Sequence, residues 1–275
     1  MKKKVATIIL NRNLPIVTNK LYEHLIKYDG KYTDVYIVEA GSDKNNLSKY
    51  CTWYADSKNI KKNGLRYCRG MNFGLFKLFK EKKYYDYEAF FLITNDTELR
   101  KTSTIYKLYN IIKKNSTIGI ISPCSKNWGE KMLIKKNNYK FFWFIHNNAY
   151  LLNRKFIDKV INKKNNTYYN FLFDGSNFRG FGSEIELISK AYSNNYAAAI
   201  TTSVWAEENE TYLIDKSHLI KTDSYEDNLN KYVLEGLYWM KNKYGFNSKW
   251  QMYNYVKNFY DDFFKYNPEF LKYKL

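Results

Sequence analysis

Polar side chains that can bind a metal ion or a phosphate follow three short apolar runs of this sequence. They form three groups, each directly after such a run: Asn11 and Asn13, Glu39 with Gly41 and Ser42, and Asn95 with Asp96. A continuous apolar run closed by polar residues is typical of a strand buried on both faces of a parallel sheet. The carboxyl ends of parallel strands meet at one edge, where open α/β sheets bind their ligands. We therefore expect these side chains to converge.

Two carboxylates stand out in these groups. Asp96 ends the run 89–93, and a hard divalent ion takes one or two carboxylates and completes its shell with water and substrate phosphates. Taken alone, Asp96 fits a helix cap or an ordinary loop residue better than a metal ligand. Glu39 stands at the tip of the second apolar run, where an acidic residue commonly bonds a nucleotide's ribose or base. The alternative is a turn with Ser42 as a helix cap.

Hydrophobic spacing predicts an alternation of strands and helices around these residues. We expect strands at 5–10, 33–38, 64–69, 89–93, 117–122, 131–135, 141–145, 149–152 and 196–200. We expect helices at 16–28, 70–79, 102–113, 154–161 and 183–194. The strand–helix–strand order predicts an α/β fold with a mainly parallel sheet and right-handed crossovers.

Two further amphipathic helices are expected at about 226–243 and 248–264. Their aromatic side chains among lysines fit packing on the preceding domain, a dimer face, or an anionic membrane surface.

The composition favours anionic partners. The formal net charge is +18, which suits nucleotide-sugars, acidic glycans, anionic membranes or nucleic acid. Arginine, whose guanidinium makes paired hydrogen bonds to phosphates and guanine edges, is scarce. Three widely spaced cysteines match neither a disulfide framework nor a zinc site and fit a reducing cytoplasm. No apolar run reaches the length of a membrane span.

Five motifs in this order resemble the family 2 glycosyltransferases, particularly their rhamnosyltransferase-like branch. They are Asn11–Asn13, Glu39-Ala40-Gly41-Ser42, Arg69-Gly70-Met71-Asn72-Phe73-Gly74, Leu92-Ile93-Thr94-Asn95-Asp96-Thr97 and Gly180-Phe181-Gly182-Ser183-Glu184-Ile185-Glu186-Leu187. The fourth corresponds to the family's metal-binding motif and the fifth to its catalytic helix start. The similarity runs from about residue 4 to about residue 212.

The resemblance implies a GT-A fold, with a Rossmann-like nucleotide-binding half and a mixed, mainly parallel central sheet. Residues 1–215 would form the catalytic domain, with 1–100 binding the nucleotide-sugar and 101–215 the acceptor, and 216–275 a C-terminal helical extension. It also implies inverting, metal-assisted transfer with Mn or Mg. Nucleotide-sugar contacts would come from Asn11, Asn13, Glu39, Gly41, Ser42, Asn72, Asn95 and Asp96.

Glu184 would be the general base and Asp96 the metal ligand. The dipole of a helix start would lower the pKa of Glu184 and burial would raise it. Glu186, two residues further on, is expected to orient or support the site and is a candidate acceptor contact. The resemblance also makes Trp143 and His146, in and after the aromatic run 141–145, candidate acceptor contacts.

Two departures from the family are visible. Glutamates stand at positions 39 and 184, where the family often has aspartates. The family commonly supplies a further metal-binding His after the strand that follows the base helix, and this stretch holds Glu207 and Glu208 instead. Either glutamate could replace the His with an oxygen ligand, and of the two we expect Glu208; the alternative is a site with a single protein ligand.

The expected acceptor is a glycan or a lipid-linked glycan, reached in the cytoplasm and with peripheral contact to an anionic membrane. Three alternatives stay open. One is sugar transfer onto a modified base of phage-type DNA, although nucleic acid is a less expected partner. The others are a non-catalytic nucleotide-sugar or glycan-binding module and a nucleotidyltransferase built on the same half-fold.

Overall fold

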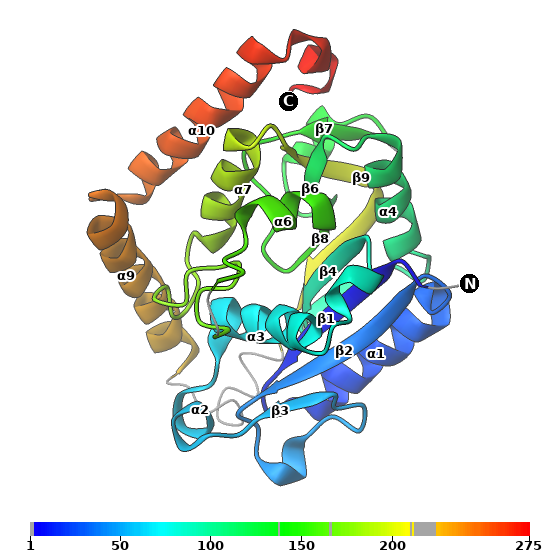
Figure 1. The fold of residues 1–275 in the computed structure, drawn as a ribbon, viewed down its shortest axis with the longest axis vertical. Helices are drawn as coiled ribbons and strands as arrows, with labels where there is room; N and C mark the ends of the chain where they lie inside the picture. Colours follow the sequence, from blue (N-terminus) through cyan, green and yellow to red (C-terminus); the bar gives the residue numbers. More distant parts are fainter. Residues whose placement is uncertain (1–2, 137, 165–166, 210, 212–223) are drawn as a thin grey trace.

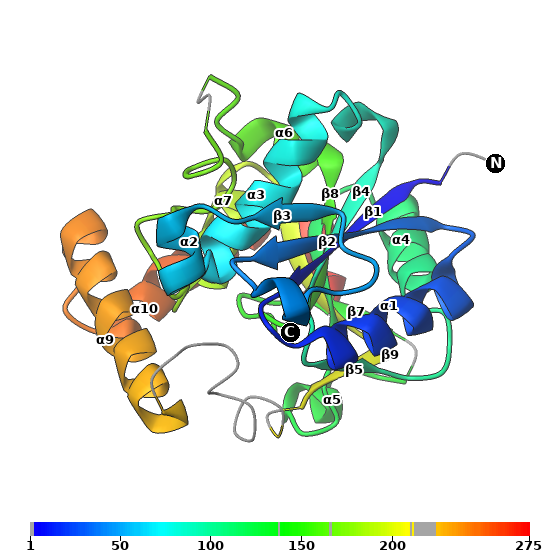
Figure 2. The same ribbon diagram turned by 90° about the horizontal axis from the view of Figure 1, so that it is seen from below.

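The computed structural model describes residues 3–136, 138–164, 167–209, 211 and 224–275. One nine-stranded mixed sheet runs through it in the order β3-β2-β1-β4-β8-β6-β9-β5, with β7 paired to β9. Helices cover both faces: α3, α6 and α7 lie on one side, and α1 and α4 on the other (Figures 1 and 2). The expected α/β sheet is therefore confirmed.

The N-terminal half is the parallel part of the sheet. Its strands are β1 (Val5–Asn11), β2 (Thr33–Ala40), β3 (Trp53–Ala55) and β4 (Ala89–Thr94). Its helices are α1 (Pro15–Asp29), η1 (Lys44–Asn46), α2 (Lys58–Asn63), α3 (Arg66–Lys80) and η2 (Tyr84–Asp86). The register places Asn11 beside Glu39 and Leu10 beside Thr94, so the three strand ends meet at one edge as expected.

The second half turns the sheet mixed. It contains β5 (Thr97–Leu99), α4 (Ile105–Lys114), β6 (Ile118–Cys124), α5 (Glu130–Leu133), β7 (Tyr139–Phe141), β8 (Ala149–Asn153), α6 (Arg154–Val160), α7 (Ser183–Ser193) and β9 (Ala197–Glu208). Strand β8 lies antiparallel between β4 and β6, and β9 runs parallel to β6. The far end of β9 pairs antiparallel with β5, which brings residue 208 back beside the end of β4.

Four short strand predictions were wrong in type or extent. Residues 64–69 include the start of α3, and residues 131–135 contain the single-turn helix α5. The strand predicted at 141–145 is in fact β7, which ends at residue 141. The strand predicted at 196–200 is the beginning of the twelve-residue β9. Apolar runs this short do not separate strand from helix or set a strand's length.

Two long helices, α9 (Tyr225–Tyr244) and α10 (Lys249–Tyr266), follow and lead to η3 (Pro268–Tyr273). Helix α9 begins where the Ser224 side chain accepts a bond from the Asp227 backbone N–H, and it ends at Gly245, whose φ is 74°. The Tyr260 hydroxyl of α10 donates to the carbonyl of Phe141 at 3.3 Å. The extension thus packs on the preceding domain, the first of its three expected roles. The predicted boundary at 215/216 lies outside the described residues.

The described helices include none with the length and apolar composition needed to cross a membrane.

Candidate active site

A closed hydrogen-bond network joins the ends of β1 and β2. Glu39 is fully buried, and its carboxylate accepts from Asn11 Nδ2 at 2.9 and 3.0 Å, from Ser42 Oγ at 2.5 Å and from the Ser48 backbone N–H at 2.7 Å. Burial raises the pKa of Glu39, and the bonds from Ser42, Asn11 and Ser48 oppose that rise. Glu39 therefore holds the two loops in place, and its direct contact to a nucleoside stays a prediction.

The same loops are joined a second time through Asn13. Its backbone N–H donates to Ser42 Oγ at 3.0 Å, and its side-chain oxygen accepts from the Asp43 backbone N–H at 2.7 Å. Gly41 adopts φ 85°, and a Cβ there would stand 2.2 Å from the Ile60 carbonyl oxygen. Only glycine fits this position because the conformation and the approach of α2 both exclude a side chain.

Asn95 extends the network to the end of β4. Its Nδ2 donates to Asn11 Oδ1 and to Thr18 Oγ1, both at 3.1 Å. The structure thus brings together the strand-end residues predicted from the sequence. Asn95, which follows β4, is hydrogen-bonded to the end of β1 and to α1.

Asp96 and Glu208 are neighbours across the β5–β9 pair. Thr97, which follows the buried Asp96, stands opposite Glu208 in the ladder, and the backbone N–H of Asn209 donates to the Asp96 carbonyl at 2.9 Å. Two carboxylates are hard oxygen donors that suit Mg or Mn. No cluster of three or more His, Cys, Asp or Glu side chains suited to a metal occurs among the described residues. The pair therefore fits an ion that takes its other ligands from a diphosphate and water.

Glu207, the other glutamate of this stretch, serves the adjacent loop. Its carboxylate accepts from Ser125 Oγ at 2.6 Å and from the Lys126 backbone N–H at 2.8 Å. These two bonds occupy the Glu207 carboxylate, which favours Glu208 over Glu207 as the second metal ligand.

Glu184 carries a buried carboxylate that is incompletely hydrogen-bonded. It lies in the first turn of α7, which starts after Gly182 at φ 74°. Only 7% of the residue is exposed, and Oε2 is buried with no hydrogen-bond partner among the described residues. Burial raises the pKa of Glu184 to about 7, so desolvation outweighs the helix-start effect. A carboxyl group that titrates near neutral pH is suited to general-base work.

The charge of Glu184 acts on three buried tyrosine hydroxyls, those of Tyr67, Tyr150 and Tyr232. The Tyr67 hydroxyl donates to that of Tyr150 at 2.6 Å, and the charge of Glu184 raises the pKa of both groups beyond the larger effect of burial. Burial also raises the pKa of Tyr232 on α9, and the charges of Glu184 and Glu208 raise it further. The proposed base and the proposed metal ligand therefore both lie near one phenol of the C-terminal extension.

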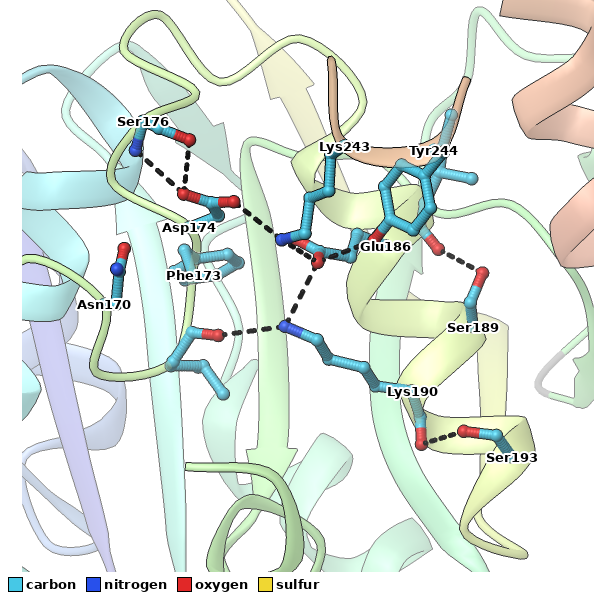
Figure 3. A network of polar contacts seen from close by, with 12 residues as sticks. Asn170, Phe173, Asp174, Ser176, Glu186, Ser189, Lys190, Ser193, Lys243 and Tyr244 are labelled. Atoms are coloured by element: carbon cyan, nitrogen blue, oxygen red, sulfur yellow. Dashed lines mark hydrogen bonds and ion pairs between the residues drawn. The ribbon is translucent and has the colours of Figure 1, made fainter. Parts of the chain in front are cut away.

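Glu186 has a different environment from Glu184, although both lie in the first turn of α7. Its Oε1 accepts from Lys243 Nζ at 2.7 Å and from the Tyr244 hydroxyl at 2.8 Å, and Lys190 Nζ lies 3.4 Å away (Figure 3). Lys243 also donates to Asp174 at 2.6 Å. Through these contacts Glu186 fastens α9 to α7. Its contact with an acceptor stays a prediction.

Asn72 was expected beside the nucleotide, and the structure gives it another task. Its amide donates to the carbonyls of Tyr169 and Phe173 and accepts from the backbone N–H groups of Leu172 and Phe173, at 2.8 to 3.1 Å. The fully buried amide has thereby used both donors and both acceptor positions. We therefore interpret Asn72 as a clamp on the segment 169–173.

A cavity of about 590 Å³ opens beside the Asp96–Glu208 pair, and its walls include Glu98, Trp128, His146, Asn148 and Glu208. His146 lies against the Trp128 ring, and its Nε2 is buried with no partner among the described residues. Burial lowers the pKa of His146 to about 3, so its imidazole is neutral at physiological pH. Trp143 instead packs on Tyr253 of α10, with ring centres 5.7 Å apart. Of the three predicted acceptor contacts, Trp143, His146 and Glu186, only His146 lines this cavity.

Trp128, Tyr232 and Lys243 belong to this site and were not singled out from the sequence. Trp128 follows a loop with no periodic signal, and the two others lie on a helix that carries no motif of its own. Only the packing of α9 on the turn 180–182 reveals Tyr232 and Lys243, because Met240 lies close to Gly182 and Gly236 lies close to the Phe181 side chain.

The sheet order, the strand-end residues and the α7 start define a GT-A fold, the class to which several solved glycosyltransferase structures belong. A crystal structure of GalNAc-T7 with UDP, GalNAc and Mn²⁺ matches 98% of this chain with a TM-score of 0.58 at 13% identity. The chain spans 57% of that protein. No family model matches the sequence, and no curated protein matches it.

Two further structures share the fold. The mannosyltransferase PcManGT from Pyrobaculum calidifontis, in complex with GDP-Man and Mn²⁺, covers 94% of this chain and 74% of its own, with a TM-score of 0.51 at 10% identity. S. aureus TarS 1-349, in complex with UDP-GlcNAc, covers 93% and 80%, with a TM-score of 0.51 at 12% identity. Structural similarity at 10 to 13% sequence identity establishes the fold and not the activity.

Proposed function

We propose that this protein is an inverting glycosyltransferase, which moves a sugar from a nucleotide-diphosphate sugar to a hydroxyl of a glycan or lipid-linked glycan. The observation that carries the proposal is Glu184, a buried carboxyl group with a pKa near 7 and an unpartnered oxygen, whose charge acts on the same Tyr232 phenol as the charge of Glu208. An unsatisfied buried polar atom costs free energy and calls for a functional explanation.

In this proposal Glu184 acts as general base. The acceptor hydroxyl attacks the anomeric carbon, its proton passes to the Glu184 carboxylate, and the bond between that carbon and the departing diphosphate oxygen breaks on the opposite face. The nucleoside diphosphate leaves and the anomeric configuration inverts. Burial makes the carboxylate basic enough to take the proton at neutral pH.

Asp96 and Glu208 would hold Mn²⁺ or Mg²⁺, which when bound stabilises the charge that develops on the diphosphate. Mn²⁺ is present in the structures of GalNAc-T7 and PcManGT. The two carboxylates of this chain supply hard oxygen ligands and leave positions for the donor.

The donor would lie across the ends of β1, β2 and β4. The internally bonded loops at Asn11, Asn13, Ser42 and Asn95 would present backbone groups and amide edges to the nucleotide. The bound molecules in the neighbouring structures, UDP, GDP-Man and UDP-GlcNAc, favour a nucleotide-sugar. A deoxyhexose donor would agree with the rhamnosyltransferase-like motifs.

The acceptor would enter the cavity beside His146 and Trp128. Neutral imidazole and indole rings are suited to hydrogen-bond and pack on sugar rings. We place this chemistry in the cytoplasm, with α9 and α10 facing an anionic membrane through exposed Tyr238, Trp250 and Tyr266 among lysines.

A thermal-shift screen of nucleotide-sugars with and without Mn²⁺ tests the proposal. At least one donor should raise Tm by several degrees when Mn²⁺ is present and by less in EDTA, because only the folded state binds it. The Asp96→Asn variant should lose the Mn²⁺-dependent part of the donor-induced rise in Tm. Glu269→Gln, a change of an exposed residue on η3, should behave as wild type. If no donor stabilises the chain with metal present, the proposal is wrong.

A further inference from the structure

A second cavity, separate from the one beside His146, lies where α4, α5, β5 and β9 come together. Its volume is about 430 Å³. Helix α5 and strands β5 and β9, which contribute or adjoin its lining residues, gather on the lower side of Figure 2.

Positive side chains surround this cavity: Arg100, Lys107, Lys131 and Lys136. No Asp or Glu is among its described lining residues, and no ion pair joins these four side chains to any described residue, although Lys131 Nζ donates to the Lys126 carbonyl. Like charges gathered around one hollow repel each other, although these four side chains are exposed and water weakens the repulsion. A bound anion would offset that repulsion.

The arginine is held in position by an aromatic ring. The Arg100 guanidinium lies over the Trp205 indole, 4.9 Å from the ring centre. Trp205 is half-buried on β9, and this contact limits the orientations of the guanidinium. A restrained guanidinium loses less entropy on binding and presents its N–H fork to phosphate oxygens.

Hydroxyl groups complete the lining. Thr102 and Ser203 lie in the wall, whereas the Thr202 hydroxyl donates to the Lys135 carbonyl at 2.7 Å and supports the loop. An arginine fork, lysine point charges and hydroxyl donors together match a group with several oxygens and about two negative charges, as in a phosphate monoester. A carboxylate would use only part of this set.

The position of the cavity relates it to the proposed reaction site. Trp205 precedes Glu208 by three residues on β9, which is about 10 Å along a strand. The cavity beside Glu208 is acidic, since Glu98, Glu207 and Glu208 line it. The two cavities thus occupy successive stretches of one strand pair and carry opposite charge.

We propose that the cationic cavity binds a phosphate group carried by the acceptor, so that the acceptor is a phosphorylated glycan. This identification of the acceptor class rests on the proposed function, whereas the anion site itself does not. The donor diphosphate is assigned to the Asp96–Glu208 side of β9, and the cationic cavity is left for the second substrate.

Calorimetric titration of inorganic phosphate into the full chain tests the site, in EDTA, at constant chloride and with no donor present. Wild type should bind phosphate saturably, and the Arg100→Gln/Lys131→Gln variant at least about tenfold more weakly. Lys114→Gln, on the same helix as Lys107 but outside the cavity, should match wild type. Absence of saturable binding, or equal binding by the double variant, overturns the proposal.

Two further arms make the result decisive. Lys107→Gln alters one exposed side chain on α4 and should weaken phosphate binding about threefold even if the double variant is poorly folded. Vesicles of phosphatidic acid form the other arm: binding to vesicles without binding to free phosphate would contradict an acceptor phosphate site. Because neither metal nor donor is present, failure here is distinct from failure of sugar transfer.

Discussion

The buried polar groups near the carboxyl edge of the sheet fall into two sets that differ in hydrogen bonding. At the ends of β1 and β2, the side chains of Glu39 and Asn13 form hydrogen bonds that join the two loops. Across the sheet, Glu184 and His146 each bury an atom with no partner among the described residues. The first set builds a rigid scaffold, and the second keeps reactive groups at a cost in stability. This contrast separates the part that shapes the donor site from the part that we assign to chemistry.

Replacement of Glu39 should produce the largest loss of stability. Glu39→Ala leaves Asn11, Ser42 and the Ser48 N–H buried without their acceptor, and we expect a loss of about 3 kcal/mol. For a chain of this size Tm should fall by about 10 °C, measured by circular dichroism. Glu269→Ala should not change Tm. An unchanged Tm for Glu39→Ala would remove the scaffold role from this network.

The stability of the protein should depend on pH through Glu184. Between its ordinary value of 4.5 and about 7, the folded state keeps a proton that the unfolded chain has released. The stabilising contribution is therefore full below pH 4.5 and is lost as pH rises to about 7, in total about 3 kcal/mol. Denaturant unfolding of wild type and Glu184→Gln measures it: the variant should be the more stable one at pH 8. Parallel pH curves would show that Glu184 is not desolvated.

Removal of the Lys243 ion pairs that hold α9 on α7 should cost less stability. Lys243→Met leaves Asp174 and Glu186 without their shared cation, and because Lys243 is one-third exposed we expect about 2 kcal/mol. Burial opposes protonation of Lys243, but the two carboxylates outweigh it and raise its pKa. Tyr244→Phe, which removes one bond to Glu186, should cost about 1 kcal/mol. Equal Tm values for wild type and Lys243→Met would contradict the network of Figure 3.

Replacement of His146 should give the smallest effect, a rise in the KM for the acceptor. His146→Gln should raise the acceptor KM about fivefold and leave the shape of the pH–rate profile unaltered, because burial keeps the imidazole neutral above about pH 3. Steady-state kinetics from pH 5 to 9 test this. A change in the acidic limb of the profile would mean that His146, and not Glu184 alone, carries a proton in the reaction.

The sequence was sufficient for the elements whose pattern is local. The apolar runs at 5–10, 33–38 and 89–93 and the helical spacing at 183–194 were confirmed, together with the convergence of Asn11, Glu39 and Asn95. A strand buried on both faces and a helix with one apolar face each leave a signature within a few residues.

What failed depends on contacts distant in the chain. The strand β9 is long because it pairs in turn with β6, β7 and β5, which no local pattern records. The difference between Glu184 and Glu186 is also tertiary: Lys243 and Tyr244 bond Glu186, whereas Glu184 is buried with an unpartnered oxygen among the described residues. Sequence spacing alone could not say which glutamate is paired.

The central claim, that Glu184 is the base of a sugar transfer, is tested most directly by the pH dependence of kcat/KM with a stabilising donor and an acceptor. Wild type should lose activity about tenfold per pH unit below about pH 7 and reach a plateau above it. Glu184→Gln should transfer about a thousandfold more slowly, without that acidic limb, while it still binds the donor. A variant that keeps more than about a tenth of wild-type activity, or the same acidic limb, would contradict the assignment.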